Sequence, residues 1–294
     1  MKQIGFIGFG HMAEALVRSL LTRKPILAKD LVVSNRSRSK LRKIKADFPT
    51  LAVTTSNIQV ARKADIIFIC VNTHEVIQVM KEILSSLDNT KHLVIISGGL
   101  EIMSVEHLFN GKISKLIPTL TCEVFQGASL LCHNRLVLEK DKKYIANLLK
   151  TIGRIELIEE DQFAVYTVLS SCAPGLIAAI FEQFIRSAVK HDKIDYRTCF
   201  EIVLSSLLGT SLLLSKKGEG FNNLIGRVAR KGGNTEIAVN IFENKLPRVY
   251  DELFGKIIKN ETRRNDFTRK QFGIPSKSKM VGARGFEPSL MDIT

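Results

Sequence analysis

Apolar segments and segments of helical periodicity alternate over the first half of the chain. Five short apolar segments predict buried strands, because a parallel strand covered on both faces is almost wholly apolar: residues 2–7, 30–34, 51–54, 64–71 and 92–97. Between them, apolar residues recur at helical spacing in three segments: residues 12–22, 37–46 and 76–87. Strands that alternate with helices predict an α/β fold with an N-terminal Rossmann-type, doubly wound parallel sheet.

A different pattern begins near residue 157, where strand signals give way to helical ones. Four helical segments follow: residues 163–169, 174–190, 196–216 and 234–260. The segment 196–214 is too apolar for a surface helix, so it should be buried in its own domain or against a second subunit. We therefore predict a cofactor-binding domain over residues 1–157, an all-α domain over 158–260, and a disordered basic tail over 261–294.

The composition narrows the class of protein. The 294-residue chain is 45% hydrophobic, which is enough to bury a core and excludes an intrinsically disordered protein. No apolar run approaches the roughly 18–20 residues of a membrane span, and the first residues lack the pattern of a signal peptide. The five cysteines are scattered without metal-ligand spacing, so we expect reduced thiols, no metal site and a cytoplasmic location.

The net charge of +14 is concentrated at the two ends of the chain. Residues 1–45 hold eleven basic and two acidic residues, and residues 256–294 hold nine basic and four acidic ones. This distribution indicates two local basic features rather than a general nucleic-acid surface. With no Trp and four Tyr, the chain also has few aromatic side chains that could stack on nucleic-acid bases. We therefore expect no nucleic-acid or membrane partner. The basic tail either contacts a polyanion or has no selected role.

A glycine-containing turn follows the first predicted strand and opens the first predicted helix. Gly8 permits the tight turn, Gly10 lets the backbone approach a diphosphate, and Ala13 keeps the helix close to the strand. The helix N-terminus then offers free N–H groups and a partial positive charge to phosphate groups. This arrangement predicts a dinucleotide-binding site.

The end of the second predicted strand distinguishes NAD from NADP. Enzymes that prefer NAD place Asp or Glu there to bind the ribose hydroxyls, whereas this chain has Asn35, Arg36 and Ser37. An acid would repel a 2′-phosphate, and these three residues would bind one. Six of residues 36–45 are basic, so we predict NADP(H) in preference to NAD(H).

Two further loops should line the cofactor, because ligands of open α/β sheets bind outside the carboxyl ends of the strands. The first runs from Cys70 to Thr73, and the second contains Ser97 and Gly98. Nothing nearby in the sequence would lower the pKa of the Cys70 thiol, so we interpret Cys70 as a small buried residue rather than a nucleophile.

From residue 2 to about 258 the chain resembles the pyrroline-5-carboxylate reductase family. The resemblance is carried by residues 7–13, 35–37 and 64–71, by the Leu-Ser-Ser-Cys-Ala-Pro motif at 169–174, and by the Arg-Lys-Gly-Gly-Asn-Thr motif at 230–235. It implies a Rossmann domain and a C-terminal all-α dimerisation domain, which form a homodimer or a higher homo-oligomer. It also implies reduction of the cyclic imine 1-pyrroline-5-carboxylate to L-proline with NAD(P)H, in proline biosynthesis.

The resemblance also implies roles for individual residues. The imino acid's carboxylate would bind Gly232, Gly233 and Asn234, with a further charged contact from Arg230, and the catalytic residue Thr235 would hydrogen-bond the imine nitrogen. Asn57 would contact the nucleoside. Together with the two loops, the cofactor-binding set is Phe6, Ile7, Gly8, Phe9, Gly10, His11, Met12, Asn35, Arg36, Ser37, Asn57, Cys70, Val71, Asn72, Thr73, Ser97 and Gly98.

Other functions fit parts of this pattern. Arg230 and Lys231, in front of the two glycines, resemble the divergent late-competence (ComER-like) branch, which favours a non-catalytic or regulatory paralogue that binds the dinucleotide. Another possibility is a reductase of a related imine or carboxylate substrate. A β-hydroxyacid dehydrogenase would need a catalytic Lys on the first long helix of the second domain, and residues 174–189 contain no Lys. A nucleic-acid-binding protein would show steep salt dependence.

Overall fold

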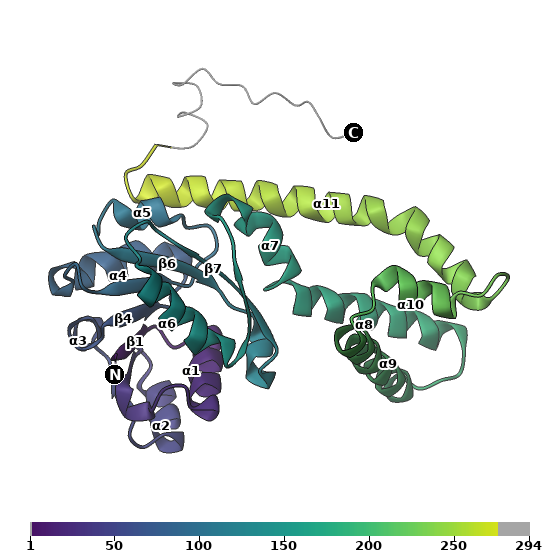
Figure 1. The fold of residues 1–294 in the computed structure, drawn as a ribbon, viewed down its shortest axis with the longest axis horizontal. Coiled ribbons are helices and arrows are strands. Elements are labelled where there is room, and N and C mark those ends of the chain that lie inside the picture. Colours follow the sequence, from purple (N-terminus) through teal and green to yellow (C-terminus); the bar gives the residue numbers. More distant parts are fainter. Residues whose placement is uncertain (1, 276–294) are drawn as a thin grey trace. The chain divides into compact units, whose positions relative to one another are not determined.

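The computed structural model describes residues 2–275, and the chain divides into two compact units. The first unit combines residues 1–172 with the segment that starts at residue 257, and the second comprises residues 173–256. The boundary lies after Cys172 rather than near residue 157, because Ile158 and Phe163 are buried in the core of the first unit. Figure 1 shows the ribbon, coloured along the sequence.

One eight-stranded sheet forms the centre of the first unit, in the order β3-β2-β1-β4-β5-β6-β7-β8. Its strands are β1 (Ile4–Ile7), β2 (Leu31–Ser34), β3 (Ala52–Thr54), β4 (Ile66–Ile69), β5 (His92–Ile95), β6 (Lys112–Ile117), β7 (Gly127–His133) and β8 (Gly153–Leu157). The first six pair in parallel, β7 is antiparallel to β6, and β8 is parallel to β7. The predicted doubly wound α/β fold is confirmed.

Helices cover both faces of this sheet (Figure 1). One face packs against α1 (His11–Arg23), α2 (Arg38–Asp47) and α6 (Glu139–Lys150). The other packs against α3 (Asn57–Lys63), α4 (Val76–Ile83), α5 (Ile102–Glu106) and α7 (Phe163–Leu169). Because both faces are buried, β1, β2, β4 and β5 carry buried residues at every position.

The strand order reverses at β1, and this reversal positions the site. The chain passes from β1 to β2 and β3 on one side, then crosses back so that β4 pairs with the other side of β1. The loops after β1 and β4 therefore leave the sheet in opposite directions and open a crevice at its carboxyl edge. The predicted glycine turn lies at this crevice.

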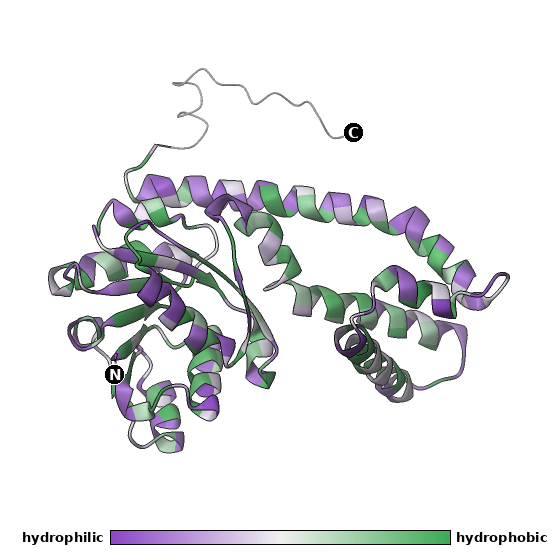
Figure 2. Ribbon diagram, in the orientation of Figure 1, coloured by the Kyte–Doolittle hydropathy of each residue, from purple (hydrophilic) through white to green (hydrophobic). Residues whose placement is uncertain are grey.

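The second unit contains α8 (Ala173–His191), α9 (Tyr196–Lys217), α10 (Phe221–Val228) and the first part of α11 (Asn234–Gln271). Figure 2 shows many hydrophobic residues along α8 and α9, and large apolar side chains of both helices are exposed in the single chain. Two helical stretches, Glu160–His191 and Tyr196–Lys217, are long and apolar enough to cross a membrane by length and composition. The expectation that no segment approaches this length is wrong by that measure.

The C-terminal prediction needs a second correction. Helix α11 continues to Gln271, and its last turns belong to the first unit, with Thr268 and Arg269 buried. The prediction of a disordered tail is therefore wrong for residues 261–275, because these polar residues pair with groups of the first unit rather than with solvent. The rest of the predicted tail, residues 276–294, lies outside the described residues.

Candidate functional site

The turn between β1 and α1 needs glycine at two positions for different reasons. Gly8 has φ of 90°, and a Cβ there would lie 2.6 Å from the carbonyl oxygen of Cys70. Gly10 is the N-cap of α1 with an extended backbone, and a Cβ there would meet nothing within 4 Å. Gly8 is thus required by the fold, whereas Gly10 keeps space open in front of the helix N-terminus. That space suits a diphosphate bound by the first N–H groups of α1.

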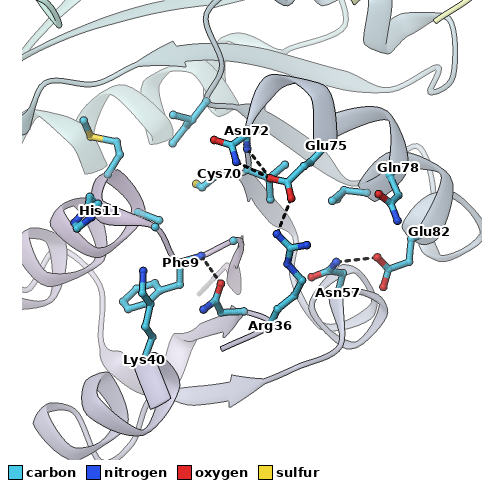
Figure 3. Close-up of a pocket in the computed structure, with 18 residues that line it drawn as sticks. Phe9, His11, Arg36, Lys40, Asn57, Cys70, Asn72, Glu75, Gln78 and Glu82 are labelled. Carbon is cyan, nitrogen blue, oxygen red and sulfur yellow. Dashed lines mark hydrogen bonds and ion pairs between the residues drawn. The ribbon is translucent and has the colours of Figure 1, made fainter. Parts of the chain in front are cut away.

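A cavity of about 440 Å³ lies in front of this turn (Figure 3). Its walls come from the loops after β1, β2 and β4, from α4 and from the start of α3. It is lined by Gly8, Phe9, Gly10, His11, Met12, Ala13, Asn35, Arg36, Lys40, Asn57, Cys70, Val71, Asn72, Glu75, Gln78, Val79, Glu82 and Ile96. The cavity thus brings together most of the predicted cofactor-binding set. The glycine turn and the basic side chains of Arg36 and Lys40 fit a phosphorylated dinucleotide.

An ion pair closes one side of the cavity. The Arg36 guanidinium, which is 90% exposed, donates to the Glu75 carboxylate over 2.6 Å (Figure 3). Burial disfavours the charged form of Glu75, but hydrogen bonds from Asn72 and the charge and hydrogen bond of Arg36 outweigh it and lower the pKa of this carboxyl. Glu75 is therefore ionised at neutral pH, and an acid faces the cavity beside the predicted 2′-phosphate residues.

Two asparagines connect the loops around the cavity. The side-chain oxygen of Asn35 accepts from the Phe9 N–H over 3.3 Å, which ties the end of β2 to the glycine turn. Asn57 accepts from the Ser34 hydroxyl over 2.7 Å and donates to Glu82 over 2.8 Å. Both amides thus lie where the sequence prediction needs them, and their contacts to a cofactor stay predictions.

The loops after β4 and β5 join through a hydroxyl pair. The Thr73 and Ser97 hydroxyls are 2.7 Å apart, and Thr73 also donates to the Gly98 carbonyl over 2.9 Å. Burial raises the pKa of the Cys70 thiol far above its ordinary value, so this cysteine stays a neutral thiol at physiological pH. That shift agrees with the interpretation of Cys70 as a packing residue.

Some predicted residues lie outside the cavity wall. Phe6 and Ile7 are fully buried within β1, where Phe6 stacks on Phe68 at a ring-centroid distance of 4.6 Å. Ser37 is the N-cap of α2, and its hydroxyl lies 2.8 Å from that of Ser39. The remaining three residues, Thr73, Ser97 and Gly98, form the junction of the two loops.

The predicted cofactor-binding set omits seven residues of the cavity wall: Ala13, Lys40, Glu75, Gln78, Val79, Glu82 and Ile96. The sequence assigns Ala13 only to helix packing. Glu75 could have been found from its position three residues after Asn72, since an acid there can cap the turn that follows the strand. Four of the others, Lys40, Gln78, Val79 and Glu82, lie on helices whose orientation toward the crevice depends on tertiary packing, and Ile96 directly follows β5.

The predicted substrate residues lie in the second unit, immediately before and at the start of α11. Gly232 has φ of 75°, and its N–H donates to the Glu236 carboxylate over 2.7 Å. The Gly233 N–H donates to the Arg230 carbonyl over 2.9 Å, and Asn234 and Thr235 form the first turn of the helix. Arg230 and Thr235 are exposed. A carboxylate oxygen thus already occupies one backbone N–H of the loop that was predicted to bind a carboxylate.

Known proteins resemble both parts of the chain. Residues 3–99 match the family described as NADP oxidoreductase, coenzyme F420-dependent, and residues 160–265 match pyrroline-5-carboxylate reductase dimerisation. The chain is 32% identical over 260 residues to pyrroline-5-carboxylate reductase 3 of Bacillus subtilis, covering 88% of this chain and 95% of that one. It is 25% identical over 252 residues to ComE operon protein 4 of the same organism, covering 86% and 92%.

Solved structures resemble it as well. A Plasmodium falciparum pyrroline carboxylate reductase with NADP bound has a TM-score of 0.80 at 25% identity, over 90% of this chain and 98% of that one. A pyrroline-5-carboxylate reductase from Coxiella burnetii also has a TM-score of 0.80 at 25% identity, over 91% and 98%. Within residues 2–275, no group of three or more His, Cys, Asp or Glu residues is arranged to hold a metal ion.

Proposed function

The chain belongs to the pyrroline-5-carboxylate reductase family, and we propose that it reduces 1-pyrroline-5-carboxylate to L-proline with NADPH in proline biosynthesis. The single observation that carries this proposal is the similarity to the Bacillus subtilis reductase, which extends over 95% of that protein. The open glycine turn supports it, because it fits the cofactor of such a reaction. The first unit would bind the cofactor, and the second would supply the substrate loop, defined as residues 230–235.

NADPH is the proposed cofactor rather than NADH. Arg36 and Lys40 line the cavity beside Asn35, and their positive charges favour a 2′-phosphate. Glu75 opposes it, since its carboxylate is ionised and pairs with Arg36. Binding of a 2′-phosphate would therefore require Arg36 to exchange one anionic partner for another.

The proposed chemistry places few demands on the protein. Bound NADPH supplies the hydride for the imine carbon. The chain's own residues must anchor the substrate carboxylate and hydrogen-bond the imine nitrogen. Gly232 has a positive φ, and its N–H donates to an anionic oxygen, that of the Glu236 carboxylate. The substrate carboxylate would replace Glu236 there, and the Thr235 hydroxyl would hydrogen-bond the ring nitrogen.

A homodimer is the proposed assembly, and the cytoplasm the proposed location. In the single chain, Ile202 is 60% exposed and Leu208 61% exposed, whereas the sequence predicted burial of this segment in its own domain or against a second subunit. Burying a large apolar side chain stabilises by about 1.5–3 kcal/mol, so a continuous apolar helix favours a partner surface. We propose a second copy of the chain as that surface rather than a lipid bilayer, because residues 160–265 match a dimerisation family.

The test is substrate-dependent oxidation of NADPH by the purified full chain. The reaction is monitored as the loss of NADPH absorbance, and proline is identified as the product. Rescue of a proline auxotroph that lacks its own reductase is the corresponding test in cells. Arg230 and Lys231, in front of the two glycines of the substrate loop, favour one alternative, a dinucleotide-binding protein without this activity. Tight NADPH binding without turnover of pyrroline-5-carboxylate would establish that alternative and refute the proposal.

A further inference from the structure

The last turns of α11 contact the loop after β5 along its whole length. The Thr268 hydroxyl donates to the Gly99 carbonyl over 2.6 Å, and the Glu261 carboxylate accepts from the Gly99 N–H. Farther along the loop, Arg269 forms an ion pair with Glu101, and both side chains are buried, at 3% and 8% exposed. These contacts lie within the first unit, beside α5 at the yellow end of α11 in Figure 1.

Arg264 reaches both loops that the sequence predicts to line the cofactor. The family resemblance implies that the first of them, from Cys70 to Thr73, lies beside the nicotinamide. Its Nη2 donates to the Gly98 carbonyl over 3.0 Å and to the Thr73 hydroxyl over 3.3 Å. Thr73 in turn bonds the Ser97 hydroxyl. One guanidinium therefore connects the loop after β4 to the loop after β5. The Nη1 atom of the same guanidinium forms an ion pair with Oε2 of Glu261 over 3.5 Å.

The backbone of the second loop is shaped for this helix. Gly99 has φ of 69°, and a Cβ there would lie 2.6 Å from the Cβ of Arg264. Any other residue would push the helix away and would also be strained in the left-handed region. The close approach brings the Arg264 side chain across Gly98 to Thr73. The loop and the helix end thus form one packed arrangement.

We propose that Arg264 is a positioning residue for the reduction, which fixes the Thr73 and Gly98 loops in the arrangement that holds the nicotinamide half of the cofactor. This proposal rests on the proposed function for the identity of the cofactor. Arg264 acts through the two loops and is not assigned a contact to the substrate or the cofactor. The neighbouring ion pair of Arg269 and Glu101 is buried and anchors the end of the helix.

The chain offers a matched control. Arg263 lines the same cavity of about 410 Å³ as Arg264, together with Asn72, Thr73, His74, Phe267 and Thr268. Within residues 2–275, the hydrogen bonds to Thr73 and Gly98 from this helix come from Arg264 and not from Arg263. Arg263→Met and Arg264→Met therefore remove the same charge from adjacent positions but only the second removes the connection between the loops.

The experiment compares Arg264→Met, Arg264→Lys and Arg263→Met in the full chain. The measurements are the dissociation constants of NADPH and of adenosine 2′,5′-bisphosphate, which lacks the nicotinamide half, and amide hydrogen exchange over residues 96–101. Since Arg264 is 47% exposed, we expect Arg264→Met to raise the NADPH dissociation constant about tenfold. Binding of the bisphosphate should not change, exchange over the loop should accelerate, and Arg264→Lys should restore part of the affinity.

Equal affinity of Arg264→Met and the unaltered chain for NADPH would overturn the proposal, as would the same loss in Arg263→Met. A parallel loss of bisphosphate binding would indicate general damage and would also overturn it. If Arg264→Met fails to fold, the same comparison is made with Arg264→Lys alone. Failure of the proposed function looks different: the chain would bind NADPH with the expected variant effects but would not reduce the imine. A chain that does not bind NADPH would refute both.

Discussion

Replacing Arg36 with alanine tests whether its guanidinium binds the 2′-phosphate of NADPH in competition with the Glu75 carboxylate. In the structure this guanidinium donates to Glu75 over 2.6 Å at the rim of the cofactor cavity. Under the proposed function it would instead hydrogen-bond the 2′-phosphate of NADPH. The substitution therefore removes a phosphate contact and leaves the ionised Glu75 without this partner beside the bound phosphate.

The magnitude follows from the exposure of the pair. A hydrogen bond to a charged group contributes about 1.5–3 kcal/mol, and an exposed ion pair that must first be broken contributes about 0.2–1 kcal/mol. Because the Arg36 side chain is 90% exposed, we take about 1.5–2 kcal/mol from the first range, subtract the second range, and expect a net loss of about 0.5–1.8 kcal/mol. This corresponds to an increase of about 2–20-fold in the NADPH dissociation constant. NADH lacks the 2′-phosphate, so its dissociation constant should change less than about twofold.

Glu75→Gln provides the complementary variant. It removes the negative charge but keeps a side chain that can cap the turn after Asn72, so the fold should be preserved. With no carboxylate competing for Arg36, NADPH binding should tighten by about threefold, the equivalent of a weak surface ion pair. In the double variant Arg36→Ala with Glu75→Gln, the repulsion is absent, and the loss relative to Glu75→Gln alone reports the phosphate contact by itself.

The assay is fluorescence titration of both reduced cofactors against the four proteins at fixed ionic strength, because the effect is electrostatic and salt screens it. The lowered pKa of Glu75 keeps this carboxyl ionised at neutral pH, so the titrations are made there, above the second pKa of a phosphate monoester, which is about 6. Equal losses of NADH and NADPH in Arg36→Ala would refute the assignment of Arg36 to the 2′-phosphate. Weaker NADPH binding in Glu75→Gln would refute the competition between the two anions.

Three further variants test separate features. Thr235→Val should lower kcat/KM about 10–100-fold, the loss of one hydrogen bond to a charged group, with an unchanged NADPH dissociation constant; steady-state kinetics that match the unaltered chain would remove Thr235 from the reaction. Gly10→Val should fold normally, since a Cβ there meets nothing within 4 Å, yet weaken NADPH more than about tenfold by filling the diphosphate space; a normal dissociation constant would contradict this. Burial opposes ionisation of Asp141, but hydrogen bonds from Lys112 and Lys2 lower its pKa to about 2. The ionised Asp141 contributes up to about 2 kcal/mol to the free energy of unfolding, and this contribution is present above the ordinary pKa of Asp and is lost as the pH falls toward 2. In Asp141→Asn, the free energy of unfolding, measured with denaturant at several pH values, should therefore fall less steeply with acid. An unaltered pH dependence would exclude this ion pair as its cause.

The first half of the fold is predictable because local pattern and tertiary environment agree there. Strands β1, β2, β4 and β5 are almost wholly apolar and buried at every position, and each lies inside a sheet covered on both faces. Strand β8 shows the opposite case. It is an edge strand and carries exposed or half-buried residues, so no continuous apolar run marks it. The sequence pattern therefore predicts the first five strands, including the other edge strand β3, but misses β8 and also the interior strands β6 and β7.

The candidate site likewise contains residues that a local motif predicts and residues that only the tertiary structure brings together. Gly8 and Gly10 belong to one turn, and their roles follow from the backbone conformation that this turn requires. Glu75 meets Arg36 only because β4 pairs beside β1, which brings the loop after β4 toward the end of β2. No local pattern records that meeting, since 39 positions separate the two residues. A prediction of cofactor preference from the end of β2 alone therefore omits the acid that competes for it.

The end of α11 explains why a polar, basic segment can be mistaken for a tail. A disordered segment is inferred from low hydrophobicity, on the assumption that only apolar burial can offset the loss of conformational entropy. Here Arg269 is buried because Glu101 supplies an opposite charge at the same depth, and Thr268 is buried because the Gly99 carbonyl accepts its hydroxyl. Removing Glu101 would take the opposite charge away from a buried guanidinium, which costs more than the contact itself contributes. Truncating the chain at residue 260, the end of the predicted second domain, would expose Glu101 and the loop from Ser97 to Gly99 together. We therefore expect such a truncation to weaken the NADPH site, although it deletes no residue of the cavity in front of the glycine turn.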